Sequence, residues 1–477
     1  MTSLGGRWSR TTIVLMLLAV IGLAVGWSTK APCATTYRTP DGQIALDWRD
    51  WRQYSDACYS DIIPLYGLER LQDGDLPYKS SWVDGGDGRT RYMEYPVVTG
   101  MLQYVAMRVT KTIVGTEDST QPRRPEVLTY FNVMVVILAV SWLIAVACTI
   151  PLSARKRDVA LMALSPLVAV HAFTNFDTLA VALAAGGMLA WARQRPVAAG
   201  VLFGLGAAAK LYPVFILGAL LVLCLRTARM QPWWKAFGGA VAAWTAVNLP
   251  FALLYPHGWW EFFRLNSTRP ADHDSIYNAI QVFTGWQGFD GPIFQGDSPR
   301  ILNLVTLGLF ALVCVVVGVI GLTAPHRPRV ASLAFLIVAG FLLTNKVWSP
   351  QYSLWLVPLA VLAIPRWIPL LIWMSVDAYL WYPRMGYFLG LGSPGRGNSP
   401  ETFLRVVVLR DVLVLALCAL VVWTIYVPRH DPVRKTGADD PAGGPLDGAP
   451  TERPRWLRPR PRDLASNEPL VGAPPPA

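Results

Sequence analysis

The sequence LTYFNVMVVILAVSWLIAVACTI, residues 128–150, is followed at once by PLSARKR, residues 151–157. A helix needs roughly 20 mostly apolar residues to cross a bilayer, because lipid offers its backbone no hydrogen-bond partners. Residues 128–150 meet that length. The basic cluster at 155–157 is typical of a loop on the cytoplasmic side. This stretch therefore predicts a transmembrane helix that ends in the cytoplasm.

Apolar runs of this kind recur along most of the chain. Of its 477 residues, 53% are hydrophobic and only 15% are charged, whereas soluble proteins carry about 25% charged residues. We expect an all-α polytopic membrane protein of about twelve transmembrane helices, with both termini in the cytoplasm. The expected spans lie at about residues 11–27, 128–150, 158–172, 177–193, 197–209, 212–226, 234–254, 300–322, 330–344, 351–364, 367–382 and 402–427.

Three polar regions complete the predicted organisation. Residues 1–429 form the transmembrane domain, with an extracytoplasmic first loop at 28–127 and a second large outer loop at 255–299. Residues 430–477 are rich in Pro, Gly, Asp and Arg, which predicts a disordered cytoplasmic tail. Within the first loop, Pro96–Gly115 is apolar but contains Gln103, Arg108 and Lys111. If it crossed the membrane, the cluster at 155–157 would lie outside, so we expect an amphipathic helix on the outer leaflet.

The charge pattern and the motifs argue against nucleic-acid, metal and nucleotide binding. The net charge is +11, but the basic residues cluster beside apolar runs, so they orient the protein in the membrane and do not indicate nucleic-acid binding. No Cys or His cluster has metal-ligand spacing, and no nucleotide-binding fingerprint is present. We expect neither a metal nor a cofactor. Cys33 and Cys58 share the first loop, where both a disulfide and two free thiols are compatible with the sequence.

Among the many acidic residues of the first loop, Asp61 stands apart. It begins Asp61-Ile-Ile-Pro-Leu-Tyr66 and leads into an apolar-periodic stretch. A carboxylate at the head of a helix beside the membrane is held at the lipid–water boundary. There it can accept a proton from a reacting hydroxyl group.

These residues belong to a longer pattern. Asp61…Tyr66…Gly74-Asp75-x-Pro77-Tyr78, followed by Glu94-Tyr95-Pro96, resembles the first loop of the C-type glycosyltransferases of family 87. The central segments Asn175-Phe-Asp177 and Gly204-Leu-Gly-Ala-Ala-Ala-Lys210-Leu-Tyr-Pro213, and the later Lys346-Val-Trp-Ser-Pro-Gln-Tyr352, are similar to that family too. The resemblance covers about residues 12–427, in order.

Two positions depart from the family pattern. Four residues separate Asp61 from Tyr66, where three are common, and Tyr95-Pro96-Val97 replaces Tyr-Pro-Pro. The changed spacing leaves Asp56 and Asp50 as alternative bases.

The resemblance implies the C-type architecture and an inverting transfer at the outer face of a bacterial plasma membrane. The donor would be a polyprenyl-phosphate sugar, with mannose expected, and the acceptor a glycolipid or cell-wall glycan. Asp61 would be the catalytic base. The residues expected to bind substrate are Tyr66, His171, Asp177, Lys210, Tyr212, Arg264, Lys346, Gln351 and Tyr352.

Other interpretations of these features stay open at this level. Lys210 and Lys346 end apolar runs, where lysines commonly extend to the interface, but Lys also binds phosphate. Asp177 is placed to cap a helix. Broken helices also suit a transporter or flippase of lipid-linked saccharides. A transporter, however, should carry ionisable groups in the middle of its spans and has no need of a long acidic loop.

Overall fold

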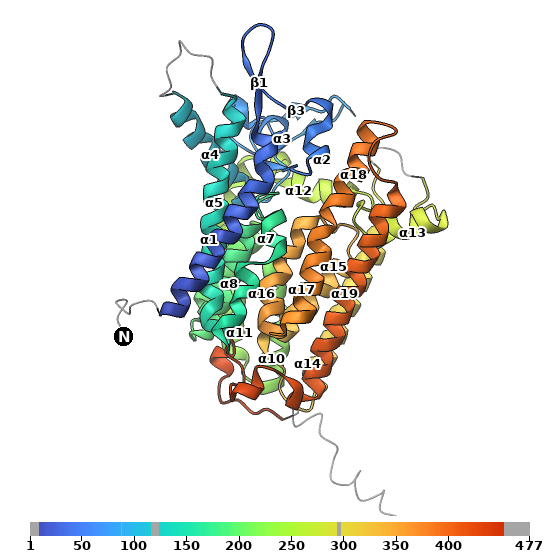
Figure 1. Ribbon diagram of the computed structural model, residues 1–477. Helices are drawn as coiled ribbons and strands as arrows, with labels where there is room; N and C mark the ends of the chain where they lie inside the picture. Colours follow the sequence, from blue (N-terminus) through green and yellow to red (C-terminus); the bar gives the residue numbers. More distant parts are fainter. Residues whose placement is uncertain (1–8, 87, 116–123, 293–296, 453–477) are drawn as a thin grey trace, which may run out of the picture.

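The computed structural model describes residues 9–86, 88–115, 124–292 and 297–452 as a mainly helical bundle with two distinct ends (Figure 1). The loop end carries residues 31–96 and the segment 255–292, and the tail end carries residues 428–452. The long helices run between these ends. The bundle helices are α1 (Arg10–Lys30), α5 (Glu126–Thr149), α6 (Ala160–Ala163), α7 (Pro166–His171), α8 (Asp177–Ala192), α9 (Pro196–Ala207), α10 (Phe215–Thr227), α11 (Met230–Leu254), α14 (Arg300–Thr323), α15 (Val330–Thr344), α16 (Ser353–Ala363), α17 (Trp367–Tyr379), α18 (Trp381–Gly392) and α19 (Pro400–Tyr426).

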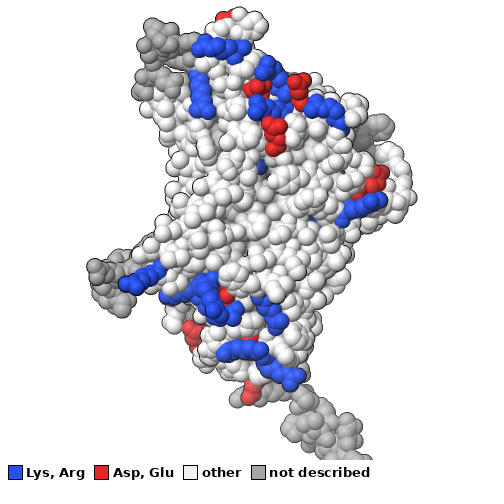
Figure 2. Space-filling view, viewed as in Figure 1, with Lys and Arg blue, Asp and Glu red and all other residues white. Residues whose placement is uncertain are grey.

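The outside of the bundle is apolar, as the bilayer requires. Among the described residues, five helices are long and apolar enough to cross a membrane: α1, α5, α11, α14 and α19. Each of these helices also has large apolar side chains that face outward, with Leu253 72% and Leu304 68% exposed. On the face shown in Figure 2, Lys, Arg, Asp and Glu gather at the two ends and leave a band of other residues between them. The chain is therefore a membrane protein.

Each apolar run that the sequence singles out contains a helix, but the helices differ in length. The run 158–172 is divided into α6 and α7, because Ser165 caps a new helix that has Pro166 in its first turn. Several other apolar helices of the interior have 10 to 17 residues, among them α8, α9 and α15. The mainly helical fold is confirmed, with two short β-hairpins added, whereas the number of crossings and the C-type architecture stay predictions.

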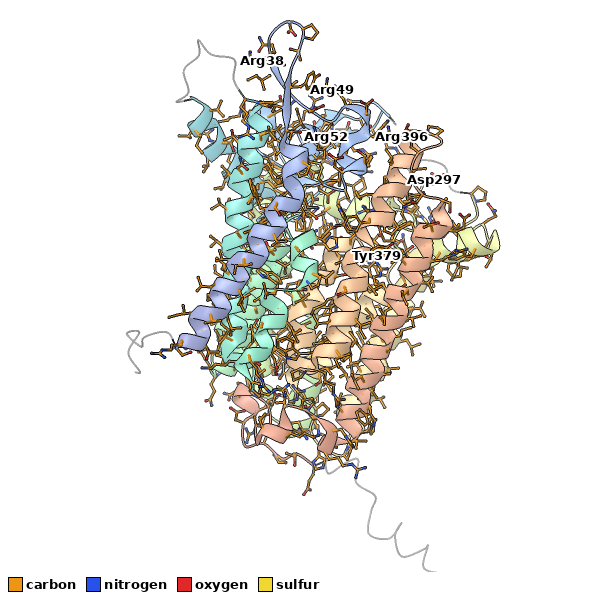
Figure 3. All side chains as sticks on the ribbon, viewed as in Figure 1. Arg38, Arg49, Arg52, Asp297, Tyr379 and Arg396 are labelled. Carbon is orange, nitrogen blue, oxygen red and sulfur yellow. A yellow bond between two sulfur atoms is a disulfide. The ribbon has the colours of Figure 1, made fainter. Side chains whose placement is uncertain are left out.

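The loop end contains short elements joined by turns. They are the hairpin of β1 (Thr36–Arg38) and β2 (Ile44–Leu46), α2 (Arg52–Ser55), α3 (Ile62–Leu68), the hairpin of β3 (Trp82–Val83) and β4 (Thr90–Arg91), α4 (Val97–Gly115), α12 (Pro256–Thr268) and α13 (Ile276–Thr284). Arg396, beyond α18, donates a hydrogen bond of 3.3 Å to the carbonyl oxygen of Asp50. Figure 3 shows Arg396 at the same end as Arg49 and Arg52. The predicted helix at 96–115 is present as α4, and its depth in the membrane stays a prediction.

The tail differs from the expected disorder over residues 430–452. Arg329 pairs with Asp431 at 2.9 Å, and Arg327 pairs with Asp439 at 2.6 Å. The indole of Trp191 donates to the carbonyl oxygen of Gly443 at 3.0 Å. A segment of this composition is disordered when no other part of the protein binds it. Here, buried arginines at the helix ends supply donors for its carboxylates and carbonyl groups. Residues 453–477 lie outside the described part.

Candidate active site

Asp61 lies directly before α3 and is held from two sides. Its backbone N–H donates to the carbonyl oxygen of Thr174 at 2.8 Å. The side-chain amide of Asn175 donates to Asp61 Oδ2 at 2.7 Å and to the hydroxyl oxygen of Tyr95 at 2.8 Å. Three segments far apart in sequence therefore meet at one carboxylate. Hydrogen bonding of this kind preorganises a group for its reaction.

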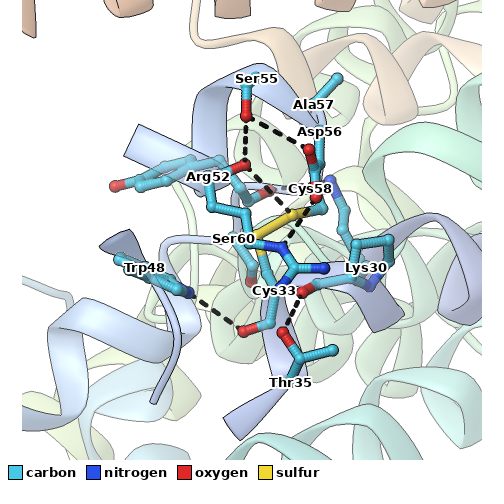
Figure 4. Close-up of a disulfide and its surroundings, with 12 residues drawn as sticks. Lys30, Cys33, Thr35, Trp48, Arg52, Ser55, Asp56, Ala57, Cys58 and Ser60 are labelled. Carbon is cyan, nitrogen blue, oxygen red and sulfur yellow. Dashed lines mark hydrogen bonds and ion pairs between the residues drawn. A yellow bond between two sulfur atoms is a disulfide. The ribbon is translucent and has the colours of Figure 1, made fainter. Parts of the chain in front are cut away.

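A disulfide fixes the segment that leads into Asp61. Cys33 and Cys58 are bonded, with Cα atoms 5.5 Å apart (Figure 4). Cys33 lies three residues after Lys30, the last residue of α1. The ammonium of Lys30 donates a hydrogen bond of 2.9 Å to the carbonyl oxygen of Tyr59. That ammonium also lies 4.3 Å from the ring centre of Trp381. The disulfide thus ties the end of α1, and its buried cation, to the residues before Asp61.

A second cation lies on the other side of Tyr95. The ammonium of Lys210 lies 3.6 Å from Asp177 Oδ2 and 5.3 Å from the ring centre of Tyr95. Asp177 Oδ1 accepts a hydrogen bond of 2.8 Å from the indole of Trp355. Asp177 is therefore not the helix cap that its position allowed, because its side chain caps no backbone N–H. It holds Lys210 and Trp355 in place.

Aromatic rings complete this group. Tyr212 and Tyr352 both stack on Trp355, with ring centres 4.6 and 4.2 Å away. The ring centre of Tyr352 is 5.1 Å from the Lys210 ammonium. Gln351 is buried in the same turn, Pro350–Tyr352. Of the residues predicted from the sequence, the structure thus brings Asp61, Asp177, Lys210, Tyr212 and Tyr352 into one group.

The remaining predicted residues have other partners. Tyr66 donates to Glu126 and stacks on Tyr130. Arg264 makes a two-point contact with Glu261 at 2.7 and 2.6 Å. His171 is fully buried, with its ring edge-on to Trp381 at 5.4 Å.

Lys346 lies just after α15 and contacts the second outer loop. Its ammonium donates to the carbonyl oxygen of Arg269 at 2.6 Å and to Asn303 at 2.5 Å. Burial, together with the positive charge of Arg269, lowers the pKa of Lys346 from 10.5 to about 8. The contacts of its ammonium are with that loop and α14, and not with Asp61, Asp177 or Tyr95.

Several residues of this group were not among those chosen from the sequence. Asn175 and Tyr95 belong to the quoted motifs but have neutral side chains, which carry no signal of proton transfer by themselves. Trp355 lies inside an apolar run, where an indole is typical of packing. Lys30 ends the first apolar run and looks like any lysine at a helix end. Only the tertiary contacts distinguish these side chains.

An apolar cavity of about 410 Å³ adjoins Tyr95. It lies between α9, α11 and α12, and its walls include Gly204, Leu211, Phe237, Trp244, Trp259 and Phe263. Phe237 and Val241, which also line it, are 39% and 48% exposed on the lipid-facing side of α11. The volume falls within the range of ligand pockets, about 300–1,000 Å³. A hydrocarbon chain in the membrane can therefore reach the side of Tyr95.

A second cavity, of about 520 Å³, lies at the loop end. We call it the acidic cavity, because Glu69, Glu94 and Glu261 line it together with Asp84, Trp82 and Arg91. The surrounding protein shields the Glu94 carboxyl group from bulk water and raises its pKa, although the side chain is exposed to the cavity. The nearby Asp61 and Glu261 carboxylates act in the same direction, whereas Arg269 and Lys210 oppose them. Glu94 thus lies within electrostatic reach of Asp61.

A comparison with protein families finds a match. Residues 125–350 match the sequence model of glycosyltransferase family 87. This confirms the resemblance to glycosyltransferase family 87. The match includes Asn175, Asp177 and Lys210 but not Asp61, which precedes it. Family 87 indicates a glycosyltransferase. A comparison with curated proteins gives no significant match.

Proposed function

We propose that this protein transfers a sugar, mannose in the first instance, from a polyprenyl-phosphate donor to a glycolipid or cell-wall glycan. One observation carries the proposal. Asn175 joins the Asp61 carboxylate to Tyr95, and Tyr95 lines the apolar cavity and lies against Lys210. A proton acceptor, a cation and a cavity for a hydrocarbon chain thus meet at one tyrosine.

The reaction needs a base for the acceptor hydroxyl. Its oxygen would attack the anomeric carbon, its proton would pass to Asp61, and the bond from that carbon to the phosphate oxygen would break with inversion. Asp50 and Asp56, the alternative bases, are both exposed. Asp56 is paired with Arg52 at 2.9 Å. The geometry therefore favours Asp61.

The leaving group is a polyprenyl monophosphate, which gains negative charge as the bond breaks. A fixed cation at that position lowers the barrier. Lys210 is 9% exposed and lies beside the apolar cavity, where the lipid chain would place the phosphate. In the resting protein, Asp177 balances its charge.

The proposal also fixes an orientation. The loop end would face away from the cytoplasm of a bacterial cell, and the tail end, with its arginines, would lie in the cytoplasm. The twelve apolar runs would then cross the membrane in the C-type arrangement. The disulfide at the loop end supports this orientation, because disulfides persist in oxidising compartments.

The base is tested by Asp61→Asn, which keeps the shape of the side chain and removes the proton acceptor. We expect transfer of radiolabelled sugar from polyprenyl phosphate to fall by about 10²–10⁴-fold. The protein should still insert into the membrane, purify and bind donor lipid, because the amide fits the same space.

Asp50→Asn and Asp56→Asn are the matched controls, since both residues share the loop and neither contacts Asn175 or Tyr95. Near-normal transfer by Asp61→Asn, with loss in one control, would move the base to that control. If all three variants and Glu94→Gln remain active, the mechanism fails. A transporter or flippase of lipid-linked saccharides then becomes the better explanation.

A further inference from the structure

The acidic cavity contains a carboxylate that the protein does not satisfy. Glu69 ends α3 and is only 7% exposed. Neither of its carboxylate oxygens makes a hydrogen bond of normal geometry within the described residues, although the Glu94 backbone N–H lies near enough to favour the charged form. A buried polar group without a partner is costly, so its retention requires an explanation. One explanation is a ligand whose own hydrogen-bonding groups satisfy the Glu69 carboxyl group.

The other charges around this cavity are largely balanced. Arg91 pairs with Asp84 at 3.2 Å, and Glu261 is held by Arg264 at 2.6 Å. Arg70, which also lines the cavity, lies 3.8 Å from Asp73. The carboxyl groups without a basic side chain in direct contact are those of Glu69 and Glu94, and the pKa of each is raised, which favours the uncharged acid. Uncharged acids attract neither a cation nor an anion, so a neutral ligand fits this cavity best. Hydroxyl groups, which both donate and accept, suit these carboxylates in either protonation state, and the indole of Trp82 offers a face for a sugar ring.

Two segments, Glu94–Tyr95 and α12, lie between the acidic cavity and the apolar cavity and line both of them. Glu94 lines the acidic cavity, and its neighbour Tyr95 lines the apolar cavity. Along α12, Glu261 and Leu265 line the first, while Trp259 and Phe263 line the second. The two cavities therefore lie on opposite sides of the Glu94–Tyr95 backbone. Asp61 lines neither cavity, but Asn175 joins it to Tyr95 and its charge acts on Glu94. A transfer between two substrates needs two sites that are both linked to the base in this way.

We propose that the acidic cavity binds an uncharged saccharide of the acceptor, with Glu69 and Glu94 hydrogen-bonded to its hydroxyl groups and Trp82 against its ring. This assignment rests on the proposed function, because it takes the apolar cavity as the donor site. It makes the acceptor a neutral glycan at the position where it is recognised. Any phosphate that the acceptor carries lies elsewhere.

Binding can be measured apart from catalysis. The probes are methyl α-mannoside, its disaccharide α-1,6-mannobiose, the anionic methyl glucuronide and the cationic methyl glucosaminide. Each is added at pH 7.5 to the Asp61→Asn protein in lipid nanodiscs without donor, and saturation-transfer NMR reports binding. We expect the neutral sugars to bind better than both charged ones. Glu69→Leu in this background should weaken mannobiose binding about tenfold or more.

The matched control is Asp41→Asn, an exposed carboxylate in the turn between β1 and β2 and outside the cavity, which should bind mannobiose normally. Glu69→Leu should also fold at least as stably as the parent, because it removes an unpartnered buried group. Equal binding of the glucuronide, preference for the glucosaminide, or unchanged binding by Glu69→Leu would each overturn the assignment. A failure of the proposed function would instead appear as full transfer activity of Asp61→Asn in the donor assay.

Discussion

The side-chain amide of Asn175 sets the distance between Asp61 and Tyr95, because one nitrogen donates to both, at 2.7 and 2.8 Å. The oxygen of the same amide accepts the backbone N–H of Phe176 at 2.7 Å, which fixes the orientation of the amide. Asp177, two positions later, holds Lys210. A single three-residue segment therefore positions both the proposed base and the proposed phosphate ligand.

Lys210→Met tests the phosphate ligand. If the ammonium stabilises the leaving phosphate, its loss should cost about 2–4 kcal/mol of transition-state stabilisation, seen as a fall in kcat. Because Asp177 would be left without its cation, Lys210→Met/Asp177→Asn is the companion variant that keeps the pair uncharged. Lys235→Met, on the exposed side of α11, is the control for a lysine far from this group.

Lys346→Met should have a smaller effect on kcat than Lys210→Met, because the Lys346 ammonium contacts the Arg269 carbonyl group and Asn303 and not the group around Asp61. Full activity in both lysine variants would show that these lysines serve only as interface residues. The phosphate ligand would then have to be sought at Arg269.

Glu69 predicts a pH dependence of stability. Burial first, and then the charge of Glu94, raises the pKa of Glu69 well above 4.5. The folded protein therefore holds this proton at pH values where the unfolded chain has lost it. The stability that the protonated form contributes is present below about pH 4.5 and is lost as the pH rises through the folded-state pKa. Between pH 5 and 8, the Tm of the parent should fall relative to that of Glu69→Gln. Parallel curves in a thermal-unfolding scan would contradict this.

The sequence identifies the charged members of the site better than the neutral ones. Asp61, Asp177 and Lys210 are ionisable residues at the ends of apolar runs, where a charge is conspicuous. Asn175, Tyr95 and Trp355 are not conspicuous, because their roles depend on a hydrogen bond or a ring contact with a distant segment. Tyr66 is the opposite case. It has the right motif, but its hydroxyl donates to Glu126 at the interface of α3 and α5.

Among the elements, α9 and α11 pack most closely, and glycines make this possible. A Cβ at Gly200 would overlap the backbone of Ala236, and one at Gly204 would overlap the backbone of Ala240. Residues four apart lie on one face of a helix, and small residues there let two backbones approach within a membrane. Gly204 also lines the apolar cavity, so this contact shapes the proposed donor site.

Gly200→Ala should therefore destabilise the protein, by about 1–3 kcal/mol, because the added methyl group has no space and the helices must separate. Gly238→Ala is the matched control. Gly238 is a helical glycine of α11 with open space around its Cβ position, and alanine there favours the helix. Thermal unfolding in the same detergent compares the two variants. Equal Tm values would contradict the close contact.

The helices themselves follow from the sequence, since apolar length and proline position determine where a helix in lipid can begin and end. The structure of the tail cannot be predicted in this way, because local composition does not reveal which distant residues bind it. Arg226 donates to the carbonyl oxygen of Ala324 at 2.9 Å and to that of Thr451 at 2.9 Å. The same side chain thus joins a helix end to the tail. Such contacts depend on tertiary structure, and the sequence shows only an arginine beside an apolar run.

For the molecule as a whole, the distribution of charge sets the orientation. The tail end holds the cluster at 155–157 together with Arg226, Arg229, Arg327 and Arg329, while the loop end holds most of the acidic residues and the disulfide. Basic loops are retained in the cytoplasm. The disulfide indicates an oxidising compartment at the opposite end. Two independent features therefore support the orientation that we propose.

This orientation is tested with single cysteines. Asp41→Cys, in the turn between β1 and β2, and Lys156→Cys are introduced after Cys148, Cys224, Cys314 and Cys418 have been replaced by alanine. We expect a membrane-impermeant maleimide to label position 41 in intact cells and position 156 only after the cells are permeabilised. If position 156 is labelled from outside, or if the two positions behave alike, the proposed arrangement of spans fails. An extracytoplasmic Asp61 would then have to be abandoned as well, because it lies at the same end of the bundle as position 41.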